Sequence, residues 1–172
     1  MSKIHAVVDT CCIVKRYNAR EKGRKLMQSL FARPRTVSIH VPNVCIPEVR
    51  YVFQKQRTTQ GVPLSVVNDM RKAFTHDIEH YNIHVYHVGG RILTMTDELI
   101  RRAFRAGTGT RIQPIDCIVL AVALTLSRVM SGVVLVTSDR KLEVAAQREK
   151  LSVWNPLDIS GIPRSLPYRR RA

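Results

Sequence analysis

Acidic residues are scarce in this chain. Its 172 residues include 13 aspartates and glutamates against 28 lysines and arginines, which gives a formal net charge of +15 at pH 7 and an isoelectric point near 10.4. Such an excess of positive charge concentrates polyanions near the surface and favours contacts with phosphates. Nucleic acid is therefore the expected partner, although charge does not separate RNA from DNA. An acidic protein partner or simple solubility is the alternative explanation.

The chain also lacks the segments that mark membrane insertion or export. No apolar run reaches the roughly 18 residues of a membrane span, and the opening MSKIHAVVDT has neither the apolar region nor the cleavage site of a signal peptide. The few cysteines form no CxxC pair and no regular framework: Cys11, Cys12, Cys45 and Cys117. The sequence predicts reduced thiols in a cytoplasmic protein that has no membrane contact.

Regular alternation of strand and helix patterns predicts the fold class. Strands are expected at Ile4–Asp9, Val37–Val41, Asn82–Val88, Val133–Val136 and Leu151–Trp154. Helices are expected at 19–32, from an Asn43 cap to about Lys55, and at 64–80, 96–106, 115–129 and 141–150. This order predicts an α/β protein, a three-layer α/β/α sandwich with a central, mainly parallel sheet. We expect one domain over residues 1–156 and a basic C-terminal tail over 157–172.

Because acidic residues are few, their positions are informative. Asp9 and Asp139 each end an apolar strand, IHAVVD and VVLVTSD. Glu48 and Asp116 each follow a proline near the start of a helix, and the helix after Asp116 is the most apolar in the chain. In a parallel sheet the carboxyl ends of strands and the following helix starts share one edge, where ligands bind. The four carboxylates are therefore expected to converge there.

Converged carboxylates repel one another, and a hard divalent cation relieves that repulsion. Oxygen-only ligands indicate Mg²⁺ or Mn²⁺ rather than zinc. For Glu48 and Asp116, each taken alone, a simpler explanation is that a negative charge near a helix N-terminus interacts favourably with the helix dipole. The set of four is harder to explain in that way.

The order VVDTCC, IPEVRYVF, PIDCIVLAVAL and VLVTSDRKL resembles a PIN domain, and among PIN domains it is most similar to the VapC-type ribonucleases of bacterial toxin–antitoxin pairs. The resemblance runs from about Lys3 to Pro156. The last two motifs are the most specific: an aspartate that opens an apolar, alanine-rich helix, and a strand that ends Thr-x-Asp.

The resemblance implies an endoribonuclease that hydrolyses RNA phosphodiester bonds with Mg²⁺ or Mn²⁺, as the toxin of a toxin–antitoxin pair. Asp9, Glu48, Asp116 and Asp139 match the family's catalytic and metal-binding acids. Thr137 matches a hydroxyl residue that orders the site, and Thr10 is expected to support Asp9. The resemblance also implies an antitoxin partner and a homodimer.

Two other functions stay open: a stand-alone PIN nuclease in RNA processing, and a PIN module that binds RNA without cleaving it. The chain is long and basic for a compact VapC-like toxin, so both functions remain as alternatives. Arginines near the acidic set are candidate RNA contacts, and solvated helix faces are the alternative: Arg50, Arg102, Arg105 and Arg111.

Some further patterns are assigned no chemistry. His76 and His80 have the i, i+4 spacing of a helical metal pair, but HDIEH lacks the zincin order, so the histidines from His76 to His87 are predicted to lie on the surface. Gly107–Thr110 lacks the Lys-Ser/Thr of a phosphate-binding loop. Cys11 and Cys117 are expected to be small, buried packing residues.

Overall fold

A five-stranded sheet forms the centre of the computed structural model, which describes residues 3–80, 82–105 and 112–158, without the side chain of Arg105. Its strands are β1 (Ile4–Val8), β2 (Val37–Pro42), β3 (His84–Tyr86), β4 (Val133–Val136) and β5 (Val153–Trp154). They lie in the order β3-β2-β1-β4-β5, and every pairing is parallel. The direction of chain crossing reverses between β1 and β4, which is where open sheets of this type place their ligand sites.

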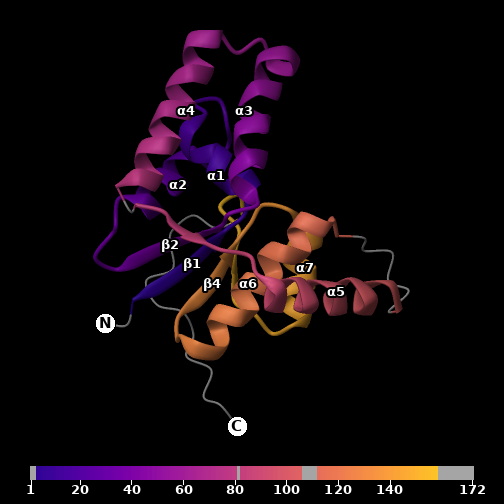
Figure 1. The fold of residues 1–172 in the computed structure, drawn as a ribbon. Helices are drawn as coiled ribbons and strands as arrows, with labels where there is room; N and C mark the ends of the chain where they lie inside the picture. Colours follow the sequence, from indigo (N-terminus) through magenta and orange to yellow (C-terminus); the bar gives the residue numbers. More distant parts are fainter. Residues whose placement is uncertain (1–2, 81, 106–111, 159–172) are drawn as a thin grey trace.

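Seven helices accompany the sheet in the described residues (Figure 1). They are α1 (Thr10–Tyr17), α2 (Arg24–Phe31), α3 (Cys45–Gln60), α4 (Leu64–Glu79), α5 (Gly90–Arg105), α6 (Pro114–Val129) and α7 (Arg140–Arg148). Helices α3 and α4 extend beyond the sheet side by side (Figure 1). Contacts join α1 to α2, α3 and α4, and join α6 to α5 and α7. Right-handed crossovers place these two groups on opposite faces of the sheet. The α/β/α sandwich expected from the sequence is confirmed.

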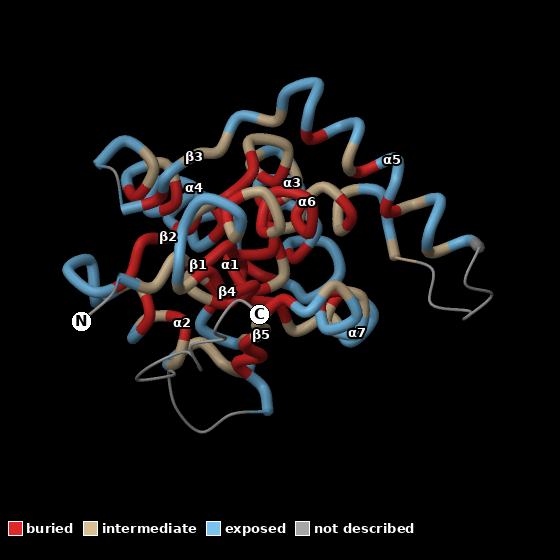
Figure 2. The backbone as a smooth tube through the Cα atoms, turned by 90° about the horizontal axis from the view of Figure 1, so that it is seen from below, coloured by how far each residue is buried: buried red, intermediate tan, exposed pale blue. Residues whose placement is uncertain are grey.

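Burial follows the apolar pattern of the chain (Figure 2). All four residues of β4 are buried, and α6 packs against β1, β2 and β4. No helix in the described parts of the chain is long and apolar enough to cross a membrane. Gly132 is required at the start of β4, because its φ is +77° and a Cβ there would lie 2.8 Å from the carbonyl oxygen of Lys3.

One helix was not expected from the sequence. The segment Thr10–Tyr17 forms α1 directly after β1, and the helix expected over 19–32 is the shorter α2. The residues TCCIVKRY have modest helix propensity, with three β-branched residues and two cysteines. Burial of Cys12, Ile13 and Val14 against the other elements decides their conformation.

Several boundaries also differ from expectation, among them the end of α3, which lies at Gln60 rather than near Lys55. Asn43 does not cap α3, which begins at Cys45; its side-chain oxygen instead accepts a hydrogen bond from the Val88 N–H at 3.2 Å. Strand β3 ends at Tyr86, two residues before the expected end at Val88. Helix α5 begins at Gly90, six residues before the expected start at Thr96. The glycine pair at 89–90 gave no sign of a helix start because glycine has poor helix propensity.

A buried carboxylate joins α1 to α4. Asp77 is 4% exposed and accepts hydrogen bonds from Tyr17 Oη at 2.7 Å, Arg16 Nε at 2.9 Å and Asn82 Nδ2 at 3.0 Å. Tyr17 also packs edge-on against Phe53 and Phe74. The hydrogen bonds to Asp77 keep its pKa below the ordinary range although burial acts in the opposite direction.

Three neighbouring strands place histidines side by side, a set that we call the histidine row: His5 on β1, His40 on β2 and His84 on β3. His5 Nδ1 lies 3.1 Å from His40 Nε2, and the rings of His40 and His84 stack with centroids 5.4 Å apart. Burial, followed by the charges of His5, His84 and Lys3, lowers the pKa of His40 to about 4.

The histidine row predicts a loss of stability in acid. Unfolded histidine titrates near pH 6.5, so between that pH and about 4 the unfolded chain binds a proton that His40 in the folded protein does not. The contribution of His40 is therefore complete above pH 6.5 and is lost as the pH falls toward 4. Because the ring is only partly buried, we expect a change of about 1 kcal/mol.

Urea unfolding of the wild type and of His40→Gln at neutral and acidic pH measures this contribution. The difference between the two proteins separates His40 from the carboxylates that titrate in the same range. The wild type should lose more stability than His40→Gln on acidification. Parallel pH profiles would contradict the prediction.

Candidate functional site

All four acidic residues expected at the site lie at helix N-termini along the carboxyl edge of the sheet. Asp9 is the N-cap of α1, and Asp139 is the N-cap of α7. Glu48 lies in the first turn of α3, and Asp116 lies in the first turn of α6. Helix N-termini stabilise negative charge. Asp9 and Asp139 follow β1 and β4, the two strands between which the crossing direction reverses.

Asp9 is the most buried of the four carboxylates, at 4% exposure. Its Oδ2 accepts a hydrogen bond from Thr137 Oγ1 at 3.0 Å and lies 3.0 Å from the donor thiol of Cys11. Burial raises the pKa of Asp9 well above its usual range, and Cys11 and the negative charge of Asp116 add to that rise. A cation beside Asp9 would oppose all three effects.

Asp139 is fixed by the backbone of the helix it caps. Its Oδ1 accepts hydrogen bonds from the N–H groups of Lys141, at 2.6 Å, and Leu142, at 3.1 Å. The Asp139 N–H donates to Thr137 Oγ1 at 3.0 Å. Thr137 therefore holds Asp9 and Asp139 in a fixed relation through one hydroxyl group. The cap uses Oδ1, which leaves Oδ2 of Asp139 outside it.

Thr10 contacts a different acid from the one expected. Its hydroxyl donates to Glu48 Oε2 at 2.5 Å rather than to Asp9. The hydroxyl belongs to the first residue of α1, so this bond ties the start of α1 to the first turn of α3. Thr10 is buried, whereas Glu48 is partly exposed.

Asp116 is partly exposed and accepts a hydrogen bond from the Gln113 N–H at 3.1 Å. Burial raises its pKa to about 6, and although the bond from Gln113 acts in the opposite direction, the charges of Asp139 and Glu48 add to the rise. Asp116 also contributes to the raised pKa of Asp9. The four carboxylates thus interact electrostatically through Asp116.

The oxygen atoms of the four acids suit a hard divalent cation, although the four side chains do not surround a common point. In the described parts of the chain, no group of three or more His, Cys, Asp or Glu residues is arranged to hold a metal ion. The four acids supply only oxygen donors, which Mg²⁺ and Mn²⁺ prefer. The raised pKa values of Asp9 and Asp116 show that negative charge there lacks compensation.

Cys11 belongs to this site, which the sequence did not indicate. It is partly exposed, and its sulfur accepts hydrogen bonds from the Ser138 N–H at 3.4 Å and the Ser138 hydroxyl at 3.2 Å. A bond with Cys12 is the main cause that lowers the pKa of Cys11 to about 5. The thiol joins the start of α1 to the turn between β4 and α7. The expectation of a simple packing residue is wrong for Cys11, whereas Cys117 is fully buried.

Replacing Thr137 with valine should destabilise the protein. The hydroxyl is completely buried, and its loss would remove one of the two side-chain donors to Asp9 Oδ2 and leave the Asp139 N–H without its acceptor. We expect a loss of about 1–3 kcal/mol in the free energy of unfolding. Thr137→Ser retains the hydroxyl and should lose less. Equal losses in the two variants, measured by urea denaturation, would contradict this role.

The candidate RNA contacts are only partly described. Arg50 is exposed on α3, two residues after Glu48, and its guanidinium lies 3.5 Å from Thr75 Oγ1. Arg102 is exposed on α5 and pairs with Glu98 at 3.8 Å and Glu149 at 3.4 Å. The side chain of Arg105, and all of Arg111 and of the loop Gly107–Thr110, lie outside the described residues.

The surface position expected for the later histidines is confirmed. His76, His80, His84 and His87 are all exposed. The ring of His76, on α4, stacks on the ring of His80, which follows the last residue of that helix, with centroids 3.8 Å apart. The ring contacts of His76, His80 and His84 are with other histidines and not with the four acids.

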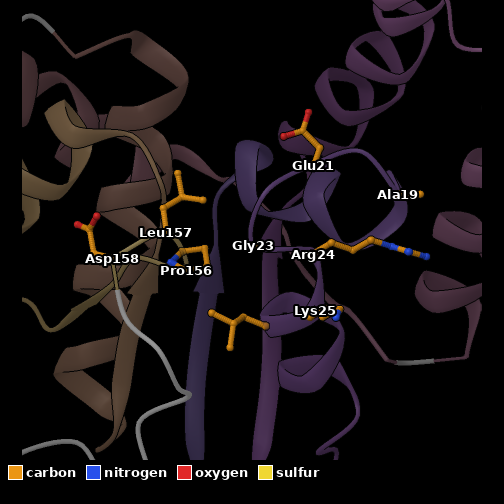
Figure 3. Close-up of a pocket in the computed structure, with 9 residues that line it drawn as sticks. Ala19, Glu21, Gly23, Arg24, Lys25, Pro156, Leu157 and Asp158 are labelled. Atoms are coloured by element: carbon orange, nitrogen blue, oxygen red, sulfur yellow. The ribbon is translucent and has the colours of Figure 1, made fainter.

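A cavity of about 590 Å³ lies apart from the acidic set (Figure 3). It opens between the connection from α1 to α2 and the segment that follows β5. It is lined by Ala19, Glu21, Gly23, Arg24, Lys25, Leu26, Pro156, Leu157 and Asp158. Its charges are mixed, and none of the four site carboxylates lines it.

Comparison with known proteins agrees with this architecture. The PIN domain family model matches residues 6–147. A structure of VapBC2 from Rickettsia felis bound to a promoter DNA fragment is similar, with a TM-score of 0.62 and 14% identity over 88% of this chain and 98% of that chain. A structure of FitAB bound to an IR36 DNA fragment has a TM-score of 0.63 and 15% identity over 91% and 98%.

FitAcB from Neisseria gonorrhoeae is also similar, with a TM-score of 0.58 and 14% identity over 91% of this chain and 100% of that chain. No curated protein matches the sequence. At these identities the solved structures establish a likeness of fold.

Proposed function

Because this chain belongs to the PIN domain family, whose members are nucleases, we propose that it is a divalent-metal-dependent endoribonuclease that hydrolyses RNA phosphodiester bonds. One observation carries the proposal: Asp9, Glu48, Asp116 and Asp139 lie at four helix N-termini and interact electrostatically through Asp116. Holding the fold together does not require four carboxylates, with their negative charge only partly compensated, at the edge of the sheet where ligands bind.

Asp9, Glu48, Asp116 and Asp139 would hold Mg²⁺ or Mn²⁺. When bound, the ion supplies activation of a water molecule and stabilisation of charge on the phosphate. Thr137 holds the carboxylate of Asp9 in place, and Thr10 holds that of Glu48. The helix N-termini oppose part of the repulsion among the acids, and a bound cation would oppose the rise in the pKa values of Asp9 and Asp116.

RNA as the substrate is supported by the charge of the protein. With a net charge of +15, the surface attracts a polyanion, and Arg50 is exposed on the same helix as Glu48. We propose that Arg50, Arg102, Arg105 and Arg111 contact the RNA. Binding should then weaken as the salt concentration rises, because each phosphate contact releases counterions.

The role of toxin in a toxin–antitoxin pair is supported by the fold. The VapBC2, FitAB and FitAcB structures are alike in architecture over nearly the whole chain. We propose an antitoxin protein as a partner and a homodimer as the assembled form. A small reading frame next to the gene, encoding an antitoxin-like protein, would favour this role over a stand-alone nuclease in RNA processing.

Cleavage of defined RNA and DNA strands of the same sequence tests the proposed activity. We expect cuts within RNA when Mg²⁺ or Mn²⁺ is present, no cuts with EDTA, and recovery when metal is restored. Salt-sensitive RNA binding without cleavage, unaffected by EDTA, would instead establish the non-catalytic binding module. Cleavage of DNA alone would contradict the choice of RNA.

A further inference from the structure

The histidine row lies apart from the acidic site and has an arrangement of its own. Its members come from three adjacent parallel strands, and ring contacts join each to the next: His5 to His40 with centroids 5.3 Å apart, and His40 to His84 with centroids 5.4 Å apart. These contacts place the three rings on one face of the sheet. His5 and His40 are partly buried, whereas His84, on the edge strand, is exposed.

The two inner rings have the spacing of two ligands that share an ion. His5 Nδ1 and His40 Nε2 face each other at 3.1 Å, which is the distance of a hydrogen bond between the two rings. A zinc ion with bonds of about 2.0–2.1 Å to imidazole nitrogen also holds neighbouring ligand atoms about 3 Å apart. An ion that binds both nitrogens lies to one side of the line between them, so both rings tilt toward it while the two nitrogens keep nearly the same separation.

We propose that the histidine row binds a divalent transition-metal ion of the zinc, copper or nickel type, through His5 Nδ1 and His40 Nε2 with His84 as the third ligand. In the structure the three rings are not arranged around one ion position, and no group of three possible ligands in the described residues is. His84 is exposed on a short edge strand and completes the set by rotating its side chain.

The chemistry of the row separates it from the carboxylate site. Imidazole nitrogen binds zinc, copper and nickel, whereas carboxylate oxygen suits magnesium and manganese. Only the neutral ring can ligate, and burial keeps the pKa of His40 near 4, so that its ring is neutral at pH 7. The ammonium of Lys3 opposes binding, because its charge acts on His5 and His40.

The proposal predicts that the ion stabilises the sheet. Its ligands come from β1, β2 and β3, which pair only in the folded protein, so an ion bound there raises the melting temperature. Lys3→Gln should strengthen binding because it removes a nearby positive charge. The inference does not depend on nuclease activity and would survive the failure of the proposed function.

Titration of the full chain with Zn²⁺ and Cu²⁺ tests the site, by calorimetry and thermal melting. The protein must carry no polyhistidine tag, and excess Mg²⁺ should be present to compete for the carboxylates. We expect binding of one ion, and a loss of at least about tenfold in affinity in His40→Ala and His5→Ala, since even residues that only orient a metal ligand contribute that much. His84→Ala changes an exposed residue, so its weaker binding can be measured without concern for folding.

Matched variants separate this site from the other candidates. His76→Ala,His80→Ala removes the exposed pair near the end of α4, and Asp116→Asn alters the carboxylate site; both should bind Zn²⁺ and Cu²⁺ as the wild type does. Electron paramagnetic resonance of bound Cu²⁺ should show coupling to nitrogen that weakens in His84→Ala. Undiminished affinity in both His40→Ala and His84→Ala would overturn the proposal, as would loss of binding in either control variant.

Discussion

Replacing Asp116 with asparagine is expected to reduce RNA cleavage by at least about a hundredfold, since even the partners that orient a metal ligand contribute ten- to a hundredfold. The substitution removes the negative charge through which the other acids interact. The asparagine carbonyl oxygen can still accept the hydrogen bond from the Gln113 N–H. Repulsion from Asp139 and Glu48 disappears, so the stability should stay the same or rise. Single-turnover cleavage of a defined RNA measures the activity, and circular dichroism reports the fold.

Asp69→Asn is the matched control for this variant. Asp69 is exposed on α4, and its substitution removes the same charge at a position away from the four acids. The control should cleave RNA at the wild-type rate. Full activity in Asp116→Asn would contradict the assignment of Asp116, and an equal loss in both variants would indicate a general effect of net charge.

Replacing Asp77 with alanine is expected to lower the free energy of unfolding by about 3–5 kcal/mol, because removing one partner of a buried pair leaves the other without compensation. Arg16 would lose its carboxylate, and the hydroxyl of Tyr17 and the amide of Asn82 would lose their acceptor. Since Asp77 joins α4 to α1, the loss should extend to the packing of Phe74 against Tyr17.

Urea unfolding measures this loss, with two variants for comparison. Asp69→Ala, on the exposed face of the same helix, should change stability by no more than about 0.5 kcal/mol. Asp77→Asn retains an acceptor oxygen and should fall between the wild type and Asp77→Ala. A small effect of Asp77→Ala would show that the contacts among the aromatic rings, rather than the carboxylate, hold α4 in place.

The sequence predicted the layers of this fold because its apolar patterns are strong. The continuous apolar run of β4 and the apolar face of α6 admit few alternatives, and strand–helix alternation indicates a parallel sheet. The short helix α1 was missed because its conformation depends on burial rather than on local propensity. Asn43 was misread because a side chain that can cap a helix can equally bond a neighbouring strand end.

The convergence of the acids also followed from sequence order, since strand ends and helix starts share one edge of a parallel sheet. The partners of those acids did not. Thr10 contacts Glu48, Cys11 contacts Asp9, and Thr137 joins Asp9 to Asp139. The bonds from Thr10 to Glu48 and from Thr137 to Asp9 each join residues more than thirty positions apart. A hydroxyl or thiol forms short-range bonds in whichever direction the packing turns it, and spacing along the chain does not encode that direction.

By itself, the sequence determined the sheet, the charge of the surface and the presence of four acids at one edge, because these depend on periodic patterns and on counting. Only the tertiary structure decided which hydroxyl and thiol hold each acid, and that His5, His40 and His84 form one row. The register between strands brings those three residues together across almost eighty positions of sequence. Contacts of that range depend on register and packing, which no local pattern of residues specifies.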